Sequence, residues 1–398
     1  MKSKASSHLL FIDGIRALAA LYVTIHHEVL QYYKIPTIYG FSFVRKNLFK
    51  FFLGGHYAVA LFIVVSGYSL MISVSRHSDT LRGGALEFFR KRVIRILPPY
   101  YLAMALSLIL IWTCIGVPTG FNWDNSLPVS SFDIVMHLLL LHDFLRPGAW
   151  HINHVFWSIS VEWRIYFFFP VLVLLWRRVR PVATVFVSVL ISLLGLGFLV
   201  GLSSLGLPVN FGEGVHPFII LFAFGMLAAD VSLSPKAWSA SFRERYASLP
   251  SWFRGVLFVV LGGLAVFVGR LDGPDRLLMP LSDITAGAFF ALCIFALAVG
   301  GDGFFRRVVG CKPLVWVGTF SYSLYLIHAP LLQVATQYGL DTWASSLDLR
   351  MGLLVLVGTP VIVGLAWLFF LVCEKPFIKM NQRGRKPVAL EVVTDPAP

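Results

Sequence analysis

The amino-acid sequence predicts an all-α integral membrane protein, a bundle of about ten transmembrane helices with its N-terminus and its C-terminus in the cytoplasm. Of the 398 residues, 57% are hydrophobic and only 13% are charged, whereas soluble domains carry about 25% charged residues. Long apolar runs recur along the whole chain, and most Lys and Arg residues lie between them. A soluble body of this size would need more polar surface, so membrane spans explain the composition better.

Ten apolar segments are long enough to cross the membrane as helices. A helix needs about 20 apolar residues to cross roughly 30 Å of hydrocarbon. In lipid such a run must be helical, because unpaired backbone groups find no water there. Charged residues or clusters of Pro and Gly separate the segments. The predicted spans are residues 14–31, 55–75, 97–117, 155–176, 181–201, 214–231, 253–270, 281–300, 314–337 and 351–373.

The connections between these segments carry unequal numbers of Lys and Arg on alternate sides. With the N-terminus inside, the cytoplasmic side holds roughly three times as many as the external side, as the positive-inside rule requires. An odd number of spans would disturb this alternation. We therefore predict a membrane domain over residues 1–380 and a short polar cytoplasmic tail over residues 381–398.

Several other classes of protein fit the sequence poorly. The net charge of +13 sits in short connections rather than on one solvated basic face, which argues against nucleic-acid binding. The chain has no Walker A, GxGxxG, GxSxG or HExxH pattern, so we expect no metal and no serine-hydrolase site. The cysteines are far apart, which argues against disulfides and zinc. They are Cys114, Cys293, Cys311 and Cys373.

The first predicted span contains two polar residues, Arg16 and His27. Eleven residues of helix correspond to about three turns and roughly 16 Å, so both side chains leave nearly the same face. A charged side chain inside a span is costly and marks a candidate site. The alternative is that Arg16 reaches back to the cytoplasmic surface while His27 bonds a neighbouring helix. Their shared face favours the site.

The third span is entered from the cytoplasm through Arg92 and Arg95, which are three residues apart and share a helix face. Paired guanidinium groups bind phosphates through forked hydrogen bonds. Basic residues at this position also serve as plain membrane anchors, and charge alone leaves both interpretations open.

The fourth span contains Glu162, with Tyr166 one turn further along. A carboxylate in a span must be paired, protonated or solvated. We expect Glu162 to be paired, and two roles are open. It orients a histidine that acts as a base, or it forms a structural pair with an arginine.

The ninth span places Ser321, Tyr325 and His328 at positions i, i+4 and i+7. They form one polar stripe on an apolar helix, which predicts that they line a cavity. The longest external connection, residues 118–153, is either a plain connector or a lid over an external substrate site.

These segments together resemble the acyltransferase-3 family of integral membrane acyltransferases. The matches follow one another from Asp13 to Phe377, nearly the full length. Each is weak alone, and six in order are specific. They are R-x10-H at Arg16 and His27, ALFIVVSGYSL over residues 60–70, RxxR at Arg92 and Arg95, WSISVEWRIY over residues 157–166, SYSLYLIH over residues 321–328, and EKPF over residues 374–377.

The chain departs from the family pattern at two points. Many members have Glu-Glu-Gln where this sequence has Glu162, Trp163 and Arg164, so a role for the first carboxylate carries over and a role for the second does not. Some members also carry a soluble esterase-like domain after the tenth span. Here we expect the membrane domain to work alone or with a separate partner.

The resemblance implies transfer of an acyl group, most often acetyl, from cytoplasmic acyl-CoA to a hydroxyl of an external or lipid-linked glycan, in a bacterial inner membrane. Our hypothesis gives His27 the role of general base, with Glu162, Tyr325 and His328 as further catalytic residues. Arg16, Arg92 and Arg95 are assigned to acyl-CoA. The alternative is a transporter or flippase of a lipid-linked sugar, although the paired repeats typical of transporters are not evident.

Overall fold

The structure is a computed structural model that describes residues 4–33, 50–76, 79–145, 148–210, 215–271, 279–301, 303–340 and 346–383. Within these ranges the regular secondary structure is helical, without a β-strand. Most of the predicted tail, residues 384–398, lies outside the described residues.

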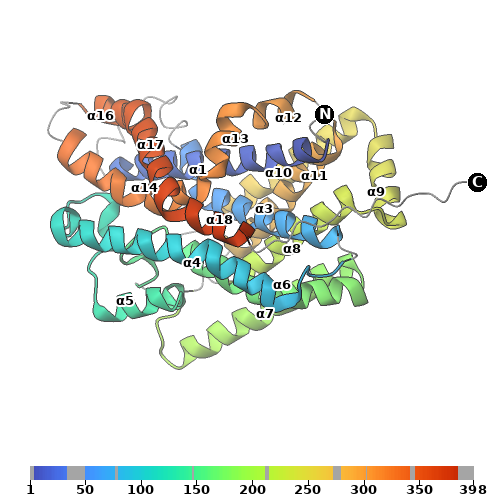
Figure 1. Cartoon of the computed structure of the whole chain (residues 1–398), viewed down its shortest axis with the longest axis horizontal. Coiled ribbons are helices and arrows are strands. Elements are labelled where there is room, and N and C mark those ends of the chain that lie inside the picture. The colour runs from blue at the N-terminus through green and yellow to red at the C-terminus, as the bar shows by residue number, and fades with distance from the viewer. Residues whose placement is uncertain are drawn as a thin grey trace, which may run out of the picture.

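Each predicted span falls on a helix or on a helix pair (Figure 1). The long helices are α1 (Lys4–Tyr33), α3 (Gly55–Ser75), α4 (Gly84–Leu110), α6 (Trp157–Arg178), α7 (Pro181–Ser204), α8 (Val215–Leu233), α10 (Ser251–Leu271), α11 (Met279–Val299) and α14 (Ser321–Ala335). The shorter ones are α5 (Ser131–Leu138), α9 (Ala237–Ser248), α12 (Phe304–Val309), α13 (Lys312–Thr319), α16 (Leu347–Leu353), α17 (Thr359–Phe369) and α18 (Lys375–Arg383).

The described residues confirm a helical membrane body but not the predicted number of spans. Seven described helices are long and apolar enough to cross a membrane, or nine if each of two bent pairs is one span. The pairs are α8 with α9, bent by 86°, and α13 with α14, bent by 75°. Helix α1 is not in this count, which covers the described residues only. The predicted count of about ten is therefore not confirmed, whereas the helical membrane body is.

Apolar side chains on the outside of the bundle support its place in lipid. Helix α7 exposes Phe186 at 68% and Leu194 at 75%, and α10 exposes Val259 at 74%. Soluble monomers rarely expose such continuous apolar surface. Lipid tails are the solvent that these helices fit.

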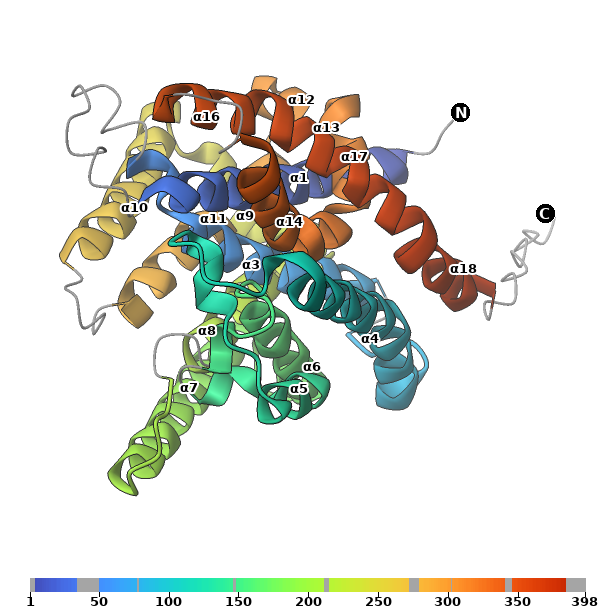
Figure 2. The same cartoon turned by 90° about the vertical axis from the view of Figure 1, so that its left-hand side faces the viewer.

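Helix α1 lies inside the bundle, with α3 on one side and α12 and α13 on the other (Figure 2). Small residues permit these crossings. A Cβ atom at Gly318 of α13 would lie 2.0 Å from the carbonyl oxygen of Asp13, and one at Gly14 would lie 1.6 Å from that of Val309. Close crossings at small residues are typical of helices packed in membranes. This packing fixes the depth and rotation of the helix that carries Arg16 and His27.

The connecting segments separate to the two ends of the bundle. Helix α9 and the N-terminal end of α1 lie at one end, on the right in Figure 1, and α5 and α16 lie at the other. Near the first end, the Nδ2 of Asn381 on α18 donates to the carbonyl oxygen of Lys91 at the start of α4. The C-terminal helix thus returns to the region where α4 begins.

Candidate active site

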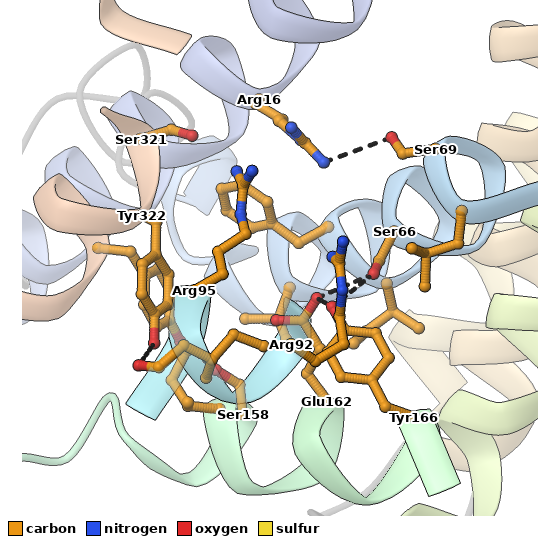
Figure 3. A pocket seen from close by; sticks show the side chains of 17 residues that line it. Arg16, Ser66, Ser69, Arg92, Arg95, Ser158, Glu162, Tyr166, Ser321 and Tyr322 are labelled. Atoms are coloured by element: carbon orange, nitrogen blue, oxygen red, sulfur yellow. Dashed lines mark hydrogen bonds between the residues drawn. The ribbon is translucent and has the colours of Figure 1, made fainter. Parts of the chain in front are cut away.

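A cavity of about 300 Å³ lies between α1, α3, α4, α6 and α14 (Figure 3). Seven of the side chains discussed from the sequence line it. They come from four helices that are far apart in the chain. They are Arg16, Arg92, Arg95, Glu162, Tyr166, Ser321 and Tyr325.

Three guanidinium groups point into this one space (Figure 3). That of Arg92 lies 5.8 Å from the ring centres of both Phe88 and Tyr166, at cation–π distance. Its buried Nε has no hydrogen-bond partner among the described residues. Arg95 follows one turn later on α4. Positive groups gathered in a buried space repel one another unless an anion joins them, so the cavity favours an anionic ligand.

Arg16 reaches the same cavity from α1. Its Nη2 lies 3.3 Å from the Oγ of Ser69 on α3, to which it donates, and its Nη1 lies 3.9 Å from a carboxylate oxygen of Asp13. The predicted alternative, in which Arg16 leaves the bundle for the membrane surface, does not describe this side chain. It bridges two helices at the cavity wall.

Glu162 has two hydroxyl partners. Its Oε1 accepts a hydrogen bond of 2.9 Å from the Oγ of Ser66 and another from the hydroxyl of Tyr166. Among the described residues that line the cavity it is the only carboxylate. The described hydrogen bonds do not join it to His27, so the pairing points to the arginine-lined cavity rather than to the histidine.

Tyr325 closes the cavity on the side towards the histidines. Its hydroxyl lies 2.7 Å from the Oγ of Ser158 and donates to the carbonyl oxygen of Val155 at 3.0 Å. The edge of its ring packs on Phe62, and on the other side its ring centre is 5.8 Å from that of His328. Tyr325 therefore stands between the arginine-lined space and the histidines.

His27 and His328 form a hydrogen-bonded pair, with 3.0 Å between the Nδ1 of His27 and the Nε2 of His328. Neither residue lines the cavity. The Nδ1 of His328 lies 2.8 Å from the carbonyl oxygen of Tyr325. A carbonyl oxygen only accepts, so this nitrogen carries the proton, and in the neutral ring the Nε2 of His328 is an acceptor.

The same reasoning fixes the tautomer of His27. Its Nδ1 faces the acceptor nitrogen of His328 and the carbonyl oxygen of Val23, both at 3.0 Å. The proton of neutral His27 therefore sits on Nδ1, and the lone pair sits on Nε2. Unlike the wholly buried His328, His27 keeps part of its surface accessible. An imidazole nitrogen with a lone pair is the kind of atom that acts as a general base.

The long external connection reaches the histidines, which sequence reasoning did not foresee. The ring centre of His154 lies 5.0 Å from that of His27. Its Nε2 accepts from the Nδ2 of Asn122 at 3.2 Å, and its Nδ1 lies 3.0 Å from the Oγ of Ser126. The one sign of this in the sequence is that His154 comes just before the motif that begins at Trp157. Residues of the connection thus hold His154 beside His27, and a lid over an external substrate site stays a prediction.

Arg164, the departure from the family pattern, anchors this connection. Its guanidinium group forms an ion pair with Asp143, with 2.6 Å between Nη1 and Oδ1, and lies 4.2 Å from the ring centre of Phe144. Asp143 also accepts from the Oγ of Ser160. Arg164 thus ties α6 to the external connection and does not line the cavity.

Within the described ranges, no group of three or more His, Cys, Asp or Glu side chains is arranged to hold a metal ion.

Comparison with known proteins places the chain in a family. A family model described as "Acyltransferase domain" matches residues 9–371. The chain is 25% identical over 343 residues to "O-acetyltransferase OatA" of Staphylococcus aureus (strain NCTC 8325 / PS 47), which covers 82% of this chain and 51% of that protein. It is 22% identical over 341 residues to "Peptidoglycan O-acetyltransferase OatA" of Listeria monocytogenes, and the match covers 82% of this chain and 49% of that protein.

The chain spans about half the length of these curated relatives. No solved structure matches it. The family match covers far more than half of the chain and includes every predicted site residue. It confirms the resemblance drawn from the motifs: the chain belongs to the acyltransferase-3 family.

Proposed function

We propose that this protein is a membrane O-acyltransferase that moves an acyl group, acetyl first of all, from cytoplasmic acyl-CoA to a hydroxyl of an external or lipid-linked glycan. One observation carries the proposal. Three guanidinium groups line a single cavity that Tyr325 also lines, and the hydrogen-bonded pair of His27 and His328 lies beside Tyr325. The names of the two relatives support acetyl and a cell-wall glycan as the first donor and acceptor to test.

The proposed orientation puts the arginine-lined cavity towards the cytoplasm. The bundle end with α9 and the start of α1 belongs to the side that the excess of Lys and Arg assigns to the cytoplasm. Arg92 and Arg95 lie in the first half of α4, on the path of a ligand entering from that end. Acyl-CoA is available only in the cytoplasm, so donor and cavity share one side.

The donor phosphates fit the cluster of guanidinium groups. Charge-assisted bonds from Arg92 and Arg95 would neutralise the phosphates, and Arg16 would contact the arm that carries the thioester. A cavity of about 300 Å³ holds the arm and a short acyl group rather than a whole coenzyme A. Glu162 balances the charge of the cluster before the donor arrives.

The proposed reaction is a direct acyl transfer. The Nε2 of His27 removes the proton of the acceptor hydroxyl while the oxygen of that hydroxyl attacks the thioester carbonyl. The C–S bond then breaks, and the proton held by His27 goes to the departing thiolate, which leaves as coenzyme A. The Tyr325 hydroxyl is placed to donate to the oxyanion once it leaves Ser158. The acyl group reaches His27 by displacing this side chain.

The test uses the full chain reconstituted in vesicles with labelled acetyl-CoA on one side and a crude glycan extract on the other. We expect acetyl-CoA consumption that depends on the glycan. Each of Arg92→Gln and Arg95→Gln should raise the KM for acetyl-CoA about 10- to 150-fold, the value of a charge-assisted hydrogen bond. The matched control is Arg90→Gln on the same helix, because Arg90 is exposed and pairs with Glu87.

If the glycan crosses the vesicle membrane while no acetyl-CoA is consumed, the protein is a transporter and the proposal is wrong. If all three arginine changes have equal effects on the KM for acetyl-CoA, the donor does not bind in this cavity.

A further inference from the structure

A second cavity, of about 440 Å³, lies where α8, α9, α10 and α11 meet. The reaction proposed above uses none of its residues. It lies at the bundle end marked by α9 in Figure 1. Its polar lining comes chiefly from Arg243 and Tyr246 of α9 and from Arg254 of α10, and its apolar lining includes Leu233 and Val299.

The two guanidinium groups at this cavity are held in place but keep free donors. The Nη1 of Arg243 donates to the carbonyl oxygens of Val231 and Ser234 at 2.7 and 3.0 Å. This fixes the group at the C-terminal end of α8 and leaves its Nη2 and Nε for a ligand. Arg254 lies 5.5 Å from the ring centre of Tyr246.

The positive charge of this cavity is not balanced by its own walls. Among the described residues that line it, none is Asp or Glu. Two guanidinium groups and a phenol hydroxyl are hydrogen-bond donors that suit a phosphate group. The cavity therefore favours a phosphate-bearing anion.

The surroundings of the cavity suit a lipid rather than a soluble anion. Helix α10 begins with Trp252, which is 68% exposed, and continues with the exposed Val256 and Val259. Exposed tryptophan marks the level of lipid headgroups, and apolar side chains beyond it face acyl tails. The guanidinium of Arg254 thus sits at headgroup level beside an apolar strip.

We propose that this cavity binds the headgroup phosphate of an anionic glycerophospholipid, with Arg243 and Arg254 on the phosphate, Tyr246 on a neighbouring headgroup oxygen, and the acyl chains along α10. The excess of basic residues at this end of the bundle adds attraction for an anionic leaflet. Inorganic phosphate shares the headgroup chemistry but lacks the acyl chains.

The test follows thermal unfolding of the detergent-solubilised full chain by tryptophan fluorescence, during titration with short-chain phosphatidylglycerol, short-chain phosphatidylcholine or inorganic phosphate. We expect phosphatidylglycerol to raise the unfolding midpoint saturably, and the other two to leave it unchanged. Arg254→Gln should raise the half-maximal lipid concentration about tenfold, as loss of a charged hydrogen bond predicts. Arg243 is left intact because it caps α8.

The control is Arg245→Gln, an exposed arginine of α9 that does not line the cavity, and it should respond as the wild type does. If Arg254→Gln does not fold, Tyr246→Phe takes its place, with a smaller shift in the same direction. An unchanged response of the cavity variant, an equal loss in Arg245→Gln, or a midpoint shift with phosphate alone would overturn the lipid site. Because no readout is enzymatic, the result is independent of the proposed reaction.

Discussion

The Nδ1 atom of His27 lies 3.0 Å from the Nε2 atom of His328, and this contact decides which nitrogen of His27 carries the proton. The backbone carbonyl of Tyr325 holds the proton of His328 on Nδ1. His328 in turn holds the proton of His27 on Nδ1, which leaves Nε2 as the acceptor. We therefore propose that His328 is a positioning residue for His27, in place of the catalytic role that the sequence suggested for it.

Replacing His328 tests this relation. His328→Leu removes the acceptor for the Nδ1 proton of His27, so we expect kcat to fall roughly 10- to 100-fold, less than the 10²–10⁴-fold of a lost general base in His27→Ala. In His328→Gln the amide oxygen lies near the position of Nε2, and most of kcat should return. The KM for acetyl-CoA should not move. Full activity of the leucine variant would refute the positioning role, and steady-state kinetics on reconstituted protein decide it.

A second prediction concerns the charge of the arginine-lined cavity. Glu162→Gln keeps an oxygen for Ser66 and Tyr166 but removes a negative charge close to the donor phosphates. We expect the KM for acetyl-CoA to fall on the order of tenfold, the size of one interaction of about 1–2 kcal/mol between partly screened charges.

The matched control is Tyr166→Phe, which removes a hydrogen bond to Glu162 and keeps the charge, so its KM should stay near that of the wild type. If Glu162 instead assists the base, the glutamine variant will lose kcat with an unchanged KM. Titration of acetyl-CoA against both variants separates these outcomes.

The sequence predicts the parts of this site that break an apolar pattern. Arg16, Arg92, Arg95 and Glu162 are charges in or beside apolar runs, and the cost of such charges in lipid singles them out without any knowledge of contacts. The helical period also places Tyr325 on the face of Ser321, and both line the cavity.

Contacts between segments that are far apart in the chain could not be predicted from the sequence. The contact of Ser66 with Glu162 depends on where α3 crosses α6, and the approach of His154 to His27 depends on how residues 118–153 fold back. The bend between α13 and α14 lies inside the predicted span 314–337, where the hydropathy gives no sign of it, whereas the bend between α8 and α9 follows the predicted end of a span at residue 231. The polar residues that make α1 a candidate for the active site also lower its hydropathy. Evidence for a site in this helix therefore weakens the evidence that the helix spans the membrane.

The third prediction concerns the wall between the cavity and the histidines. Tyr325→Phe removes the hydroxyl that contacts Ser158 and Val155, and with it the proposed donor to the oxyanion. Loss of one such donor costs about 10²–10³-fold in kcat, and the KM for acetyl-CoA should stay the same.

The control for this change is Tyr322→Phe on the same helix. Tyr322 also lines the cavity, but its hydroxyl donates to the backbone oxygen of Ile96 at 3.1 Å. We expect this variant to lose some thermal stability and little kcat. Equal kcat losses in the two variants would mean that Tyr325 only supports the wall.

The fourth prediction concerns the crossing of α1 and α13. A Cβ atom at Gly318 would lie 2.0 Å from the carbonyl oxygen of Asp13, so Gly318→Ala must push the two helices apart. We expect poor yield or a lower unfolding midpoint, together with lost activity because Arg16 and His27 move with α1.

Gly364→Ala on α17 is the control, because a Cβ there meets nothing within 4 Å. It should be neutral or stabilise the helix by up to about 1 kcal/mol. Yield, thermal unfolding and acetyl-CoA consumption are compared for the pair. Wild-type behaviour of the Gly318 variant would show that the crossing does not set the position of α1.

The last prediction concerns acid stability of the external connection. His137 and His142 are buried there with their ring centres 3.8 Å apart and nearly parallel. Burial lowers the pKa of His142 to about 3, and burial together with the neighbouring His142 holds the pKa of His137 well below its ordinary value. Below about pH 6.5, His137 and His142 bind protons in the unfolded segment but not in the folded one. The free energy of unfolding therefore falls as the pH falls.

Each histidine should contribute up to about 1.4 kcal/mol per pH unit to this loss between pH 6.5 and pH 4.5. Hydrogen exchange of residues 131–144, corrected for the intrinsic rate at each pH, measures it. His142→Phe keeps a flat ring in the stack but takes up no proton, so its slope should be about half that of the wild type. If the two slopes are equal, the acid sensitivity comes from other groups, among them the pair between Asp133 and His151, whose carboxylate oxygen and Nδ1 are 2.9 Å apart.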